Sequence, residues 1–214
     1  METSIGNKET GFKINNTAND PVNNMDCKGN NAACMTITEV REDDTASLLE
    51  IYAPYVRDTA ISFEYDVPVP EEFRNRIREI SARYPYLKAT DQNGEVLGYA
   101  YAASFKSRKA YDWSVETTVY LRQDMRGGGI GRSLYEELEA RLKQRGFLNM
   151  NACIAVPKPG DPYLTDASIL FHHAMGFQDV GTFHNSGFKF GRWYDMIWME
   201  KLIGEHGSFH QRPF

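Results

Sequence analysis

From residue 35 onward, the alternation of hydrophobic and polar positions predicts a series of strands and helices. The stretch MTITEV, residues 35–40, alternates with the period of a strand. Apolar residues then recur at helical spacing after an acidic start, which predicts a helix with its buried face at Ala46, Leu49, Ala53 and Val56. Residues 70–84 open with proline and two glutamates, as a first helical turn does, and predict a second helix with an apolar face at Phe73, Ile77 and Ile80.

The next region predicts a hairpin and then a strand that runs into a glycine-rich turn. Two β-type runs flank Asn93-Gly94, a pair typical of a tight hairpin turn. Residues 110–121, AYDWSVETTVYL, indicate a further strand. After the glycines, apolar residues at fourfold spacing predict a helix that ends at Gly146 and buries Ile130, Leu134, Leu138 and Leu142.

Four more elements complete the predicted domain. Residues 147–156 read as a buried strand, and 165–177 as a short helix with Asp166 as N-cap and Gly176 as terminator. Two strand runs divided by Gly191 follow. The order of elements is strand, two helices, three strands, helix, strand, helix and two strands, which describes a mixed α+β domain with helices packed on a central sheet.

The two ends of the chain lack this pattern. Residues 1–34 are rich in Asn, Thr, Lys and Gly with only scattered apolar positions, so we expect a disordered tail. The domain itself is expected to cover 35–204, with 205–214 as a C-terminal tail. A chain of 214 residues, 42% of them hydrophobic, is long enough for one globular domain with a substantial core.

Composition narrows the class of protein. A net charge of -5 and a pI of about 5.6 give no reason to expect nucleic acid or an anionic membrane as the main partner. No stretch approaches the roughly 20 apolar residues of a membrane span, and no secretory signal is evident. Cys27, Cys34 and Cys153 show no paired spacing, so neither a disulfide framework nor a metal site is expected. These features favour a cytoplasmic protein.

The glycine-rich turn is the first candidate for chemistry. A strand that leads through glycines into a helix directs unpaired N–H groups and the positive end of the helix dipole at one point, which suits a phosphate. A Walker loop is excluded because Gly131 is followed by Arg132 and Ser133, and a dinucleotide fingerprint is excluded because Arg132 takes its third glycine position. The remaining pattern is R-x-x-G-x-G, at Arg126, Gly129 and Gly131, with a flexible surface turn as the alternative.

Four stretches resemble the GNAT N-acetyltransferase superfamily and, within it, the phosphinothricin acetyltransferase branch. They are RGGGIG after TVYL, KSRKAYDWSVETTVYL (106–121), SILFHHAMGF (168–177) and GFKFGRWYDMIW (187–198). The resemblance covers residues 35–203 and implies a GNAT fold with a mostly antiparallel, twisted sheet. It also implies acetyl-coenzyme A (acetyl-CoA) as donor. Its pyrophosphate would be held by the backbone of Gly127, Gly128, Gly129, Ile130, Gly131 and Arg132, with added charge from Arg126 and Arg132.

The strand before the glycines carries the candidate catalytic group. Glu116 lies among residues that favour burial, where a carboxylate is costly unless hydrogen-bonded or functional, so we expect a general base, with a structural salt bridge as the alternative. A bulge at Val119 would free its N–H to polarise the acetyl carbonyl. The resemblance further implies that Val119, Tyr120 and Leu121 hold the pantetheine arm. His172 stands where many GNAT enzymes carry a tyrosine, and its role as acid, base or substrate contact stays open.

The chain departs from the resemblance in PKPGDPYLTDAS, residues 157–168. Relatives place an asparagine there to hold pantetheine, whereas Thr165 takes that position here. Ser168 fits the family's serine. Both residues are candidate cofactor contacts.

Basic residues beside the catalytic strand indicate an acidic acceptor. Lys106 and Arg108, next to Tyr111, suit a point charge and a bidentate clamp for an anion, with a solvated basic hairpin as the alternative. By the resemblance these positions, with Phe63 and Glu64, form a pocket for phosphinothricin, methionine sulfone or methionine sulfoximine. The acetyl group would pass directly to the acceptor's primary amine. The resemblance also implies a homodimer and a role in detoxification and in antibiotic or herbicide resistance.

Two other functions stay open. The chain could be a GNAT module that binds a coenzyme A compound without turnover, which Glu116 argues against. It could also acetylate protein N-termini or a cationic small molecule, which Lys106 and Arg108 argue against.

Overall fold

The computed structural model describes residues 35–125, 127–208 and 211–214, and its elements follow the predicted order. The helices of this part are α1 (Thr45–Asp58), α2 (Pro70–Ser81), α3 (Ile130–Gln144) and α4 (Ala167–Ala174). The strands are β1 (Thr36–Glu39), β2 (Tyr86–Thr90), β3 (Val96–Ser104), β4 (Ser114–Leu121), β5 (Asn149–Val156), β6 (Gln178–Lys189) and β7 (Arg192–Leu202). The expected hairpin at Asn93-Gly94 joins β2 to β3, and Gly94 has the positive φ of 83° that such a turn requires.

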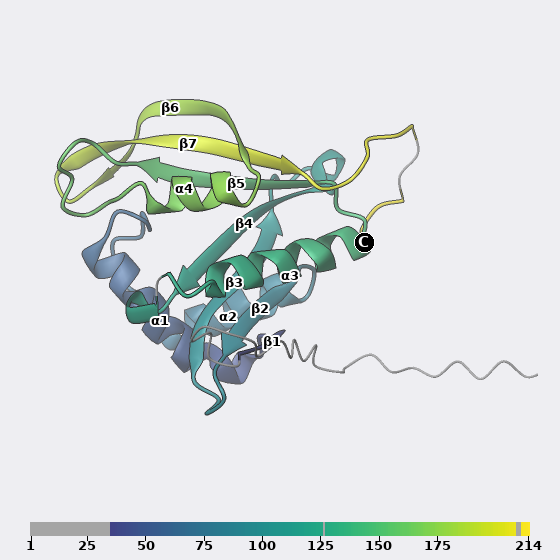
Figure 1. The fold of residues 1–214 in the computed structure, drawn as a ribbon, viewed down its shortest axis with the longest axis horizontal. Helices are drawn as coiled ribbons and strands as arrows, with labels where there is room; N and C mark the ends of the chain where they lie inside the picture. Colours follow the sequence, from purple (N-terminus) through teal and green to yellow (C-terminus); the bar gives the residue numbers. More distant parts are fainter. Residues whose placement is uncertain (1–34, 126, 209–210) are drawn as a thin grey trace, which may run out of the picture.

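The seven strands form one sheet in the order β1-β2-β3-β4-β5-β7-β6, which confirms the mostly antiparallel sheet (Figure 1). Every neighbouring pair is antiparallel except β4 and β5, which are parallel and pair only from Ser114 to Glu116. Beyond Glu116 the two strands part, while β4 stays paired with β3 as far as Leu121 and β5 with β7 as far as Val156. The sheet therefore opens as a fork between β4 and β5, and Figure 1 shows β4 slanting away from β5.

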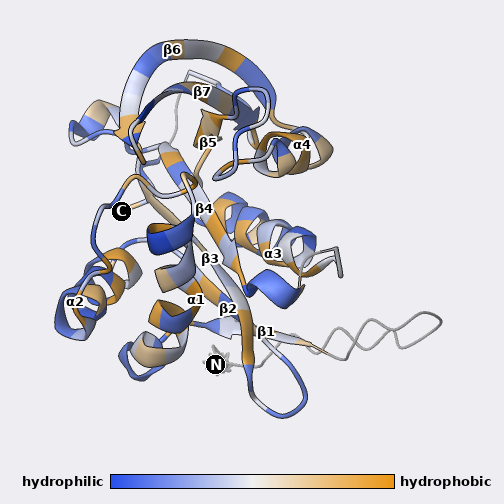
Figure 2. Cartoon of the chain, turned by 90° about the vertical axis from the view of Figure 1, so that its left-hand side faces the viewer, coloured by the Kyte–Doolittle hydropathy of each residue, from blue (hydrophilic) through white to orange (hydrophobic). Residues whose placement is uncertain are grey.

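Two hydrophobic layers cover the sheet. On one face, α3 buries Ile130, Leu134, Leu138 and Leu142 as the spacing predicted, together with apolar residues of β2 to β5 and the end of α4. On the other face, α1 and α2 pack on a layer rich in tyrosine. In Figure 2 the strands β2 to β4 stand between α1 and α2 on one side and α3 on the other.

The buried face of α1 differs from the predicted one. Of the four predicted positions the structure buries Val56, half-buries Leu49 and Ala53, and exposes Ala46. The rest of the buried face is formed by the larger side chains of Leu48, Ile51, Tyr52 and Tyr55. The two tyrosines decide the difference, because each buries its ring while its hydroxyl finds a partner. Tyr52 Oη lies 2.7 Å from Ser62 Oγ, and Tyr55 O–H donates to Leu121 O at 2.6 Å. Asp166 stands at the N-cap of α4, as expected, but its side chain makes no capping bond.

The domain limits stay predictions, because residues 1–34 lie outside the described residues. In the last described segment the Phe214 ring packs on Tyr84 and Phe147, at centroid distances of 5.4 and 5.5 Å. Within the described ranges no helix is both long and apolar enough to cross a membrane.

Candidate active site

The apex of the fork is closed by two buried polar side chains. Asn151 Nδ2 donates to Val115 O at 3.0 Å, and Thr117 Oγ1 donates to Asn151 O at 3.2 Å. Asn151 is 8% exposed and Thr117 is 4% exposed. These bonds satisfy backbone groups at the point where the parallel ladder stops, because buried carbonyl groups need partners. The fork is thus a built feature of the sheet.

A cavity of about 350 Å³ lies on the α3 and α4 side of the fork. It is lined by most residues that the sequence assigned to the donor, namely Val119, Leu121, Gly127, Gly128, Gly129, Ile130, Gly131, Arg132, Thr165 and Ser168. Phe171, Met125, Ala167, Ile61 and Tyr55 complete its wall. Arg126 lies outside the described residues. We call this cavity the donor cleft.

The glycines of this cleft are required by backbone conformation. Gly127 and Gly129 have φ of 85° and 80°, a region that residues with a Cβ rarely adopt, and a Cβ on either would meet no atom within 4 Å. The space over the loop is therefore open. Gly129 is the N-cap of α3, whose first turn holds no acidic residue, and the amides of residues 130–132 have no acceptor within the helix. This loop fits a diphosphate.

The Val119 amide is freed by the fork and not by a bulge. The register between β3 and β4 runs without a shift from Gly98–Leu121 to Ser104–Val115, so the bulge expected at Val119 is absent. Arg122 N–H donates to Leu97 O at 2.9 Å. Because hydrogen-bonded pairs alternate along an antiparallel ladder, the N–H of Val119 points away from β3, toward the gap left by β5.

Tyr120 lies apart from the donor cleft. Successive side chains of a strand face opposite sides of the sheet, so Tyr120 points toward α1. Its ring packs edge-on against Tyr52 and Tyr55, at centroid distances of 4.9 and 5.0 Å. Of the three strand residues assigned to the donor, the structure brings Val119 and Leu121 into the cleft.

A second cavity, of about 410 Å³, adjoins the donor cleft and shares Ile61, Val119 and Ser168 with it. We call it the acceptor cavity. Glu116 lines it together with Phe63, Glu64 and His172, and further wall residues are Tyr52, Thr117, Thr118, Tyr120, Tyr135, Cys153, Leu164 and Met196. Burial raises the pKa of Glu116, and the positive charge of Lys106 opposes this. Glu116 thus stands at the fork as a partly desolvated carboxylate.

His172 is buried, and both of its ring nitrogens are engaged. Nδ1 lies 2.7 Å from Ser168 O, and because a carbonyl only accepts, Nδ1 carries the proton. Burial lowers the pKa of His172, which favours the neutral ring. Its Nε2 then accepts the O–H of Tyr135 at 3.0 Å. His172 therefore holds a tyrosine hydroxyl against the wall of the acceptor cavity.

The basic loop lies outside the wall of this cavity. Lys106 Nζ sits over the rings of Phe105 and Trp198, at 4.7 and 5.1 Å from their centroids. Tyr111 packs edge-on against Phe105, and Arg108 is exposed. None of the three predicted residues Lys106, Arg108 and Tyr111 lines the cavity wall, although the charge of Lys106 reaches Glu116. Of the other two predicted contacts, Phe63 and Glu64 line the wall, and Glu64 pairs with Arg76 at 2.5 Å.

The profile of the acetyltransferase (GNAT) domain matches residues 37–198. The chain belongs to the GNAT acetyltransferase family. It is 39% identical over 172 residues to a phosphinothricin N-acetyltransferase of Alcaligenes faecalis, covering 80% of this chain and 83% of the relative. An L-methionine sulfoximine/L-methionine sulfone acetyltransferase of Salmonella typhimurium is 33% identical over 178 residues, covering 81% of this chain and 98% of that protein.

A solved GNAT structure shares the fold. It is a phosphinothricin acetyltransferase from Sinorhizobium meliloti in complex with acetyl-CoA, with a TM-score of 0.74 and 36% identity over 82% of this chain and 92% of that one. The family match makes this chain an acyltransferase, and the neighbour's bound acetyl-CoA agrees with a donor cleft beside the glycine loop.

Sequence reasoning missed three residues of this GNAT site, namely Thr117, Tyr135 and Asn151. These residues could have been recognised as polar side chains within otherwise apolar stretches of sequence. Asn151 interrupts a buried strand, and Tyr135 follows Leu134 on the buried face of α3. A buried polar group needs a partner, which the sequence alone does not identify.

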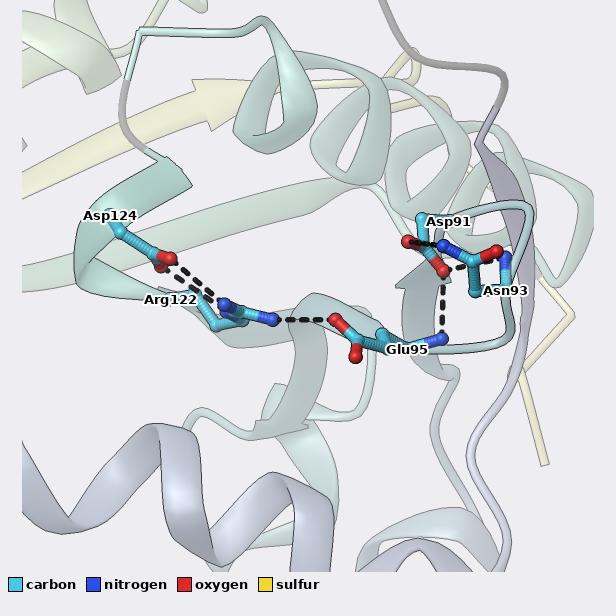
Figure 3. A network of polar contacts seen from close by, with 5 residues as sticks. All are labelled: Asp91, Asn93, Glu95, Arg122 and Asp124. Carbon is cyan, nitrogen blue, oxygen red and sulfur yellow. Dashed lines mark hydrogen bonds and ion pairs between the residues drawn. The ribbon is translucent and has the colours of Figure 1, made fainter.

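Arg122 joins the start of the glycine loop to the hairpin between β2 and β3. Its guanidinium makes two bonds to Asp124, at 3.2 and 2.8 Å, and one to Glu95 at 3.1 Å (Figure 3). Asp91 in turn accepts the N–H groups of Asn93 and Glu95, at 2.9 and 2.8 Å. The network fixes the turn Gln123–Met125, which leads into the glycines.

We predict that Arg122→Ala weakens acetyl-CoA binding by loosening this turn. Because such exposed ion pairs are weak, the Kd should rise only about fivefold. Titration calorimetry measures it. Arg74→Ala is the matched control, because it removes an exposed pair with Glu71 on α2. An unchanged Kd for Arg122→Ala would show that the network does not hold the loop.

Proposed function

We propose that this chain transfers the acetyl group of acetyl-CoA to the primary amine of a small acidic amino acid or analogue. The observation that carries the proposal is the place of Glu116. It is the last residue of β4 paired with β5, and it lines the cavity that adjoins the donor cleft.

The donor would lie along the fork. The amides of residues 130–132 and the open backbone of Gly127 and Gly129 suit its diphosphate, and the Val119 N–H faces the gap where an acyl carbonyl needs polarisation. Bound acetyl-CoA supplies an acetyl group activated as a thioester. Thr165 and Ser168 line the same cleft as Val119 and Leu121.

Glu116 is proposed as the general base for direct attack by the amine. The acceptor's ammonium must lose a proton before its nitrogen can form a bond, and a carboxylate with a raised pKa is a better proton acceptor. Among the described residues no hydrogen bond contributes to the pKa of Glu116, which speaks against the structural salt bridge. The carboxylate is thus available to the acceptor cavity.

Tyr135 and His172 are proposed to serve the leaving group. The thiolate that departs needs a proton, and the Tyr135 hydroxyl, which donates to His172 Nε2, lines the same cavity as Glu116. To supply the proton its O–H would turn from His172 to the sulfur, and the phenolate left behind would take a proton from solvent before the next turnover. His172 would act here through Tyr135.

The acceptor class follows from the charges around the cavity. A zwitterionic amino acid presents an ammonium to Glu116 and Glu64 and an anionic end to the basic loop of Lys106 and Arg108. Relatives at 39% and 33% identity carry the names of phosphinothricin and methionine sulfoximine or sulfone acetyltransferases, which agrees with this class.

A homodimer is part of the proposal. Strand β6 is a sheet edge, and nearly all of its residues are exposed. Val180, Phe183 and Phe188 on β6 and Trp193 on β7 are 59%, 61%, 43% and 53% exposed. Figure 2 shows hydrophobic and hydrophilic residues interspersed along the arch of β6. An exposed sheet edge that carries several large apolar side chains suits a second copy of the chain, and sedimentation velocity measures the assembly.

We predict that Glu116→Gln lowers kcat by about 100-fold or more while leaving the Kd for acetyl-CoA nearly unchanged, because the amide cannot accept the proton. In the wild type, activity should rise with pH as Glu116 loses its proton, at a pKa above the ordinary value of 4.5. That limb of the pH profile should vanish in the variant.

Steady-state release of free thiol across pH measures both effects. Glu79→Gln, an exposed glutamate of α2, is the control and should behave as wild type. A wild-type kcat in Glu116→Gln would remove this carboxylate from the mechanism.

The function is tested by an acceptor screen. Purified protein with acetyl-CoA should release thiol with phosphinothricin, methionine sulfone or methionine sulfoximine, and not with peptides or aminoglycosides. Turnover with peptides or aminoglycosides alone would favour the alternative acceptors. Binding of acetyl-CoA with no turnover on any amine would favour a module without catalysis.

We predict that Arg108→Ala raises the KM for the acceptor by about tenfold and leaves the KM for acetyl-CoA unchanged, because the proposal assigns this charge to the anionic end of the acceptor and to no part of the donor. Steady-state kinetics with each substrate varied in turn separates the two constants. A change in the acetyl-CoA constant alone would mean that the acidic end of the acceptor lies elsewhere.

A further inference from the structure

Lys189, the last residue of β6, is a buried lysine bonded entirely to backbone. Its side chain is 2% exposed, and Nζ donates to Val56 O at 2.7 Å, Thr59 O at 2.9 Å and Ser62 O at 2.5 Å. An ammonium has three donors, and all three are used. Lys189 forms no ion pair within the part of the chain that the structure describes, although the charge of Glu64 acts on it.

The three carbonyls belong to one short stretch, the end of α1 and the turn that follows it. The last carbonyls of a helix have no partner inside the helix and carry the negative end of its dipole. A cation at the C-terminal end of a helix is stabilised by this dipole and donates hydrogen bonds to the unpaired carbonyls. Lys189 therefore caps α1 from a strand more than 120 residues further along the chain, which fixes the direction in which the chain leaves the helix.

The residues that leave α1 form the segment between α1 and α2, residues 59–69. This segment forms one wall of the acceptor cavity. Phe63 and Glu64 line this cavity, and Ile61 lines both it and the donor cleft. The segment is also bound by Ala60 N–H, which donates to Tyr163 O at 3.0 Å.

The two residues before Lys189 on the strand contact the same segment. Tyr65 O–H donates to Phe188 O at 2.6 Å. A Cβ on Gly187 would lie 2.5 Å from Phe63 Cε1, so the glycine makes room for this ring. Three successive residues of β6 thus position the segment from Val56 to Tyr65.

We propose that Lys189 is a positioning residue for the acceptor, which it does not touch. By capping α1 it sets the place of Phe63 and Glu64, and through them the shape of the acceptor cavity. The inference rests on the proposed function for the identity of the acceptor, whereas the capping itself is independent of it.

Lys189→Met tests the inference, because it keeps the length and apolar stem of the side chain and removes the ammonium. The KM for methionine sulfone should rise about tenfold or more, while the Kd for acetyl-CoA stays within about threefold of wild type. Lys189→Arg should not restore the acceptor KM, because a planar guanidinium cannot direct its donors at three converging carbonyls. Lys88→Met is the control: Lys88 is also a poorly exposed lysine, paired with Asp44 at the opposite end of the sheet.

Amide hydrogen exchange gives a readout that does not depend on activity. In Lys189→Met, exchange should rise across residues 59–65 and stay unchanged in the glycine loop. Gly187→Ala is the second variant, used if Lys189→Met does not fold. Its methyl group displaces the Phe63 ring and should raise the acceptor KM with the lysine still in place.

The outcomes separate the two ideas. A wild-type protein that acetylates none of the acceptors overturns the proposed function, and hydrogen exchange still tests the cap. An unchanged acceptor KM in Lys189→Met, or in Gly187→Ala if Lys189→Met does not fold, overturns the positioning role when the wild type is active. Unchanged exchange across residues 59–65 in Lys189→Met overturns it as well.

Discussion

The site depends on the parting of β4 from β5. Three residues of each strand pair in parallel, and beyond Glu116 each strand keeps only its outer neighbour. Backbone groups that would complete the ladder are left facing a gap, which is costly in a protein interior unless a partner is supplied. Asn151 and Thr117 supply partners at the apex. Beyond the apex, residues of the two parted strands line the donor cleft and the acceptor cavity. The same opening that leaves backbone groups unpaired therefore creates the space for both cavities.

This arrangement also sets the environment of the carboxylate that is proposed as general base. Glu116 occupies the last paired position, where it is half-buried by the sheet yet open to the cavity that the fork creates. The preceding residue on the same face of β4, Ser114, lies within the part of the strand that is paired with β5. A later residue on that face, Tyr120, points into the tyrosine layer beneath α1. The topology of the sheet, and not the local sequence, gives this glutamate its environment.

Periodicity and glycine spacing were sufficient to predict the order of elements, the hairpin turn and the buried face of α3, because these features are set by residues close in sequence. The buried face of α1 was predicted only in part, at Val56, since apolar spacing gave no weight to two tyrosines whose hydroxyls bond to distant groups. The glycine loop was predicted as a phosphate site from its place between a strand and a helix, which local sequence shows. The Val119 N–H is freed by the parting of two strands, a feature that only the register reveals. The roles of Asn151 and Lys189 depend on partners 36 and 127 to 133 residues away, beyond what spacing can indicate.

The two cavities take most of their walls from different parts of the chain. The donor cleft is built from β4, the glycine loop and α4, whereas the segment after α1, together with β5 and β7, closes much of the acceptor cavity. Substitutions in the segment after α1 or in β6 can therefore change which amine is accepted while the affinity for acetyl-CoA stays constant. Ile61 is the described residue of that segment that borders both cavities, and at this position a gain in acceptor range would be coupled to a change at the thioester. Because the two cavities are built in this way, substitutions in one short segment, which is held in place by β6, can alter the acceptor specificity of the fold without changes to the donor cleft.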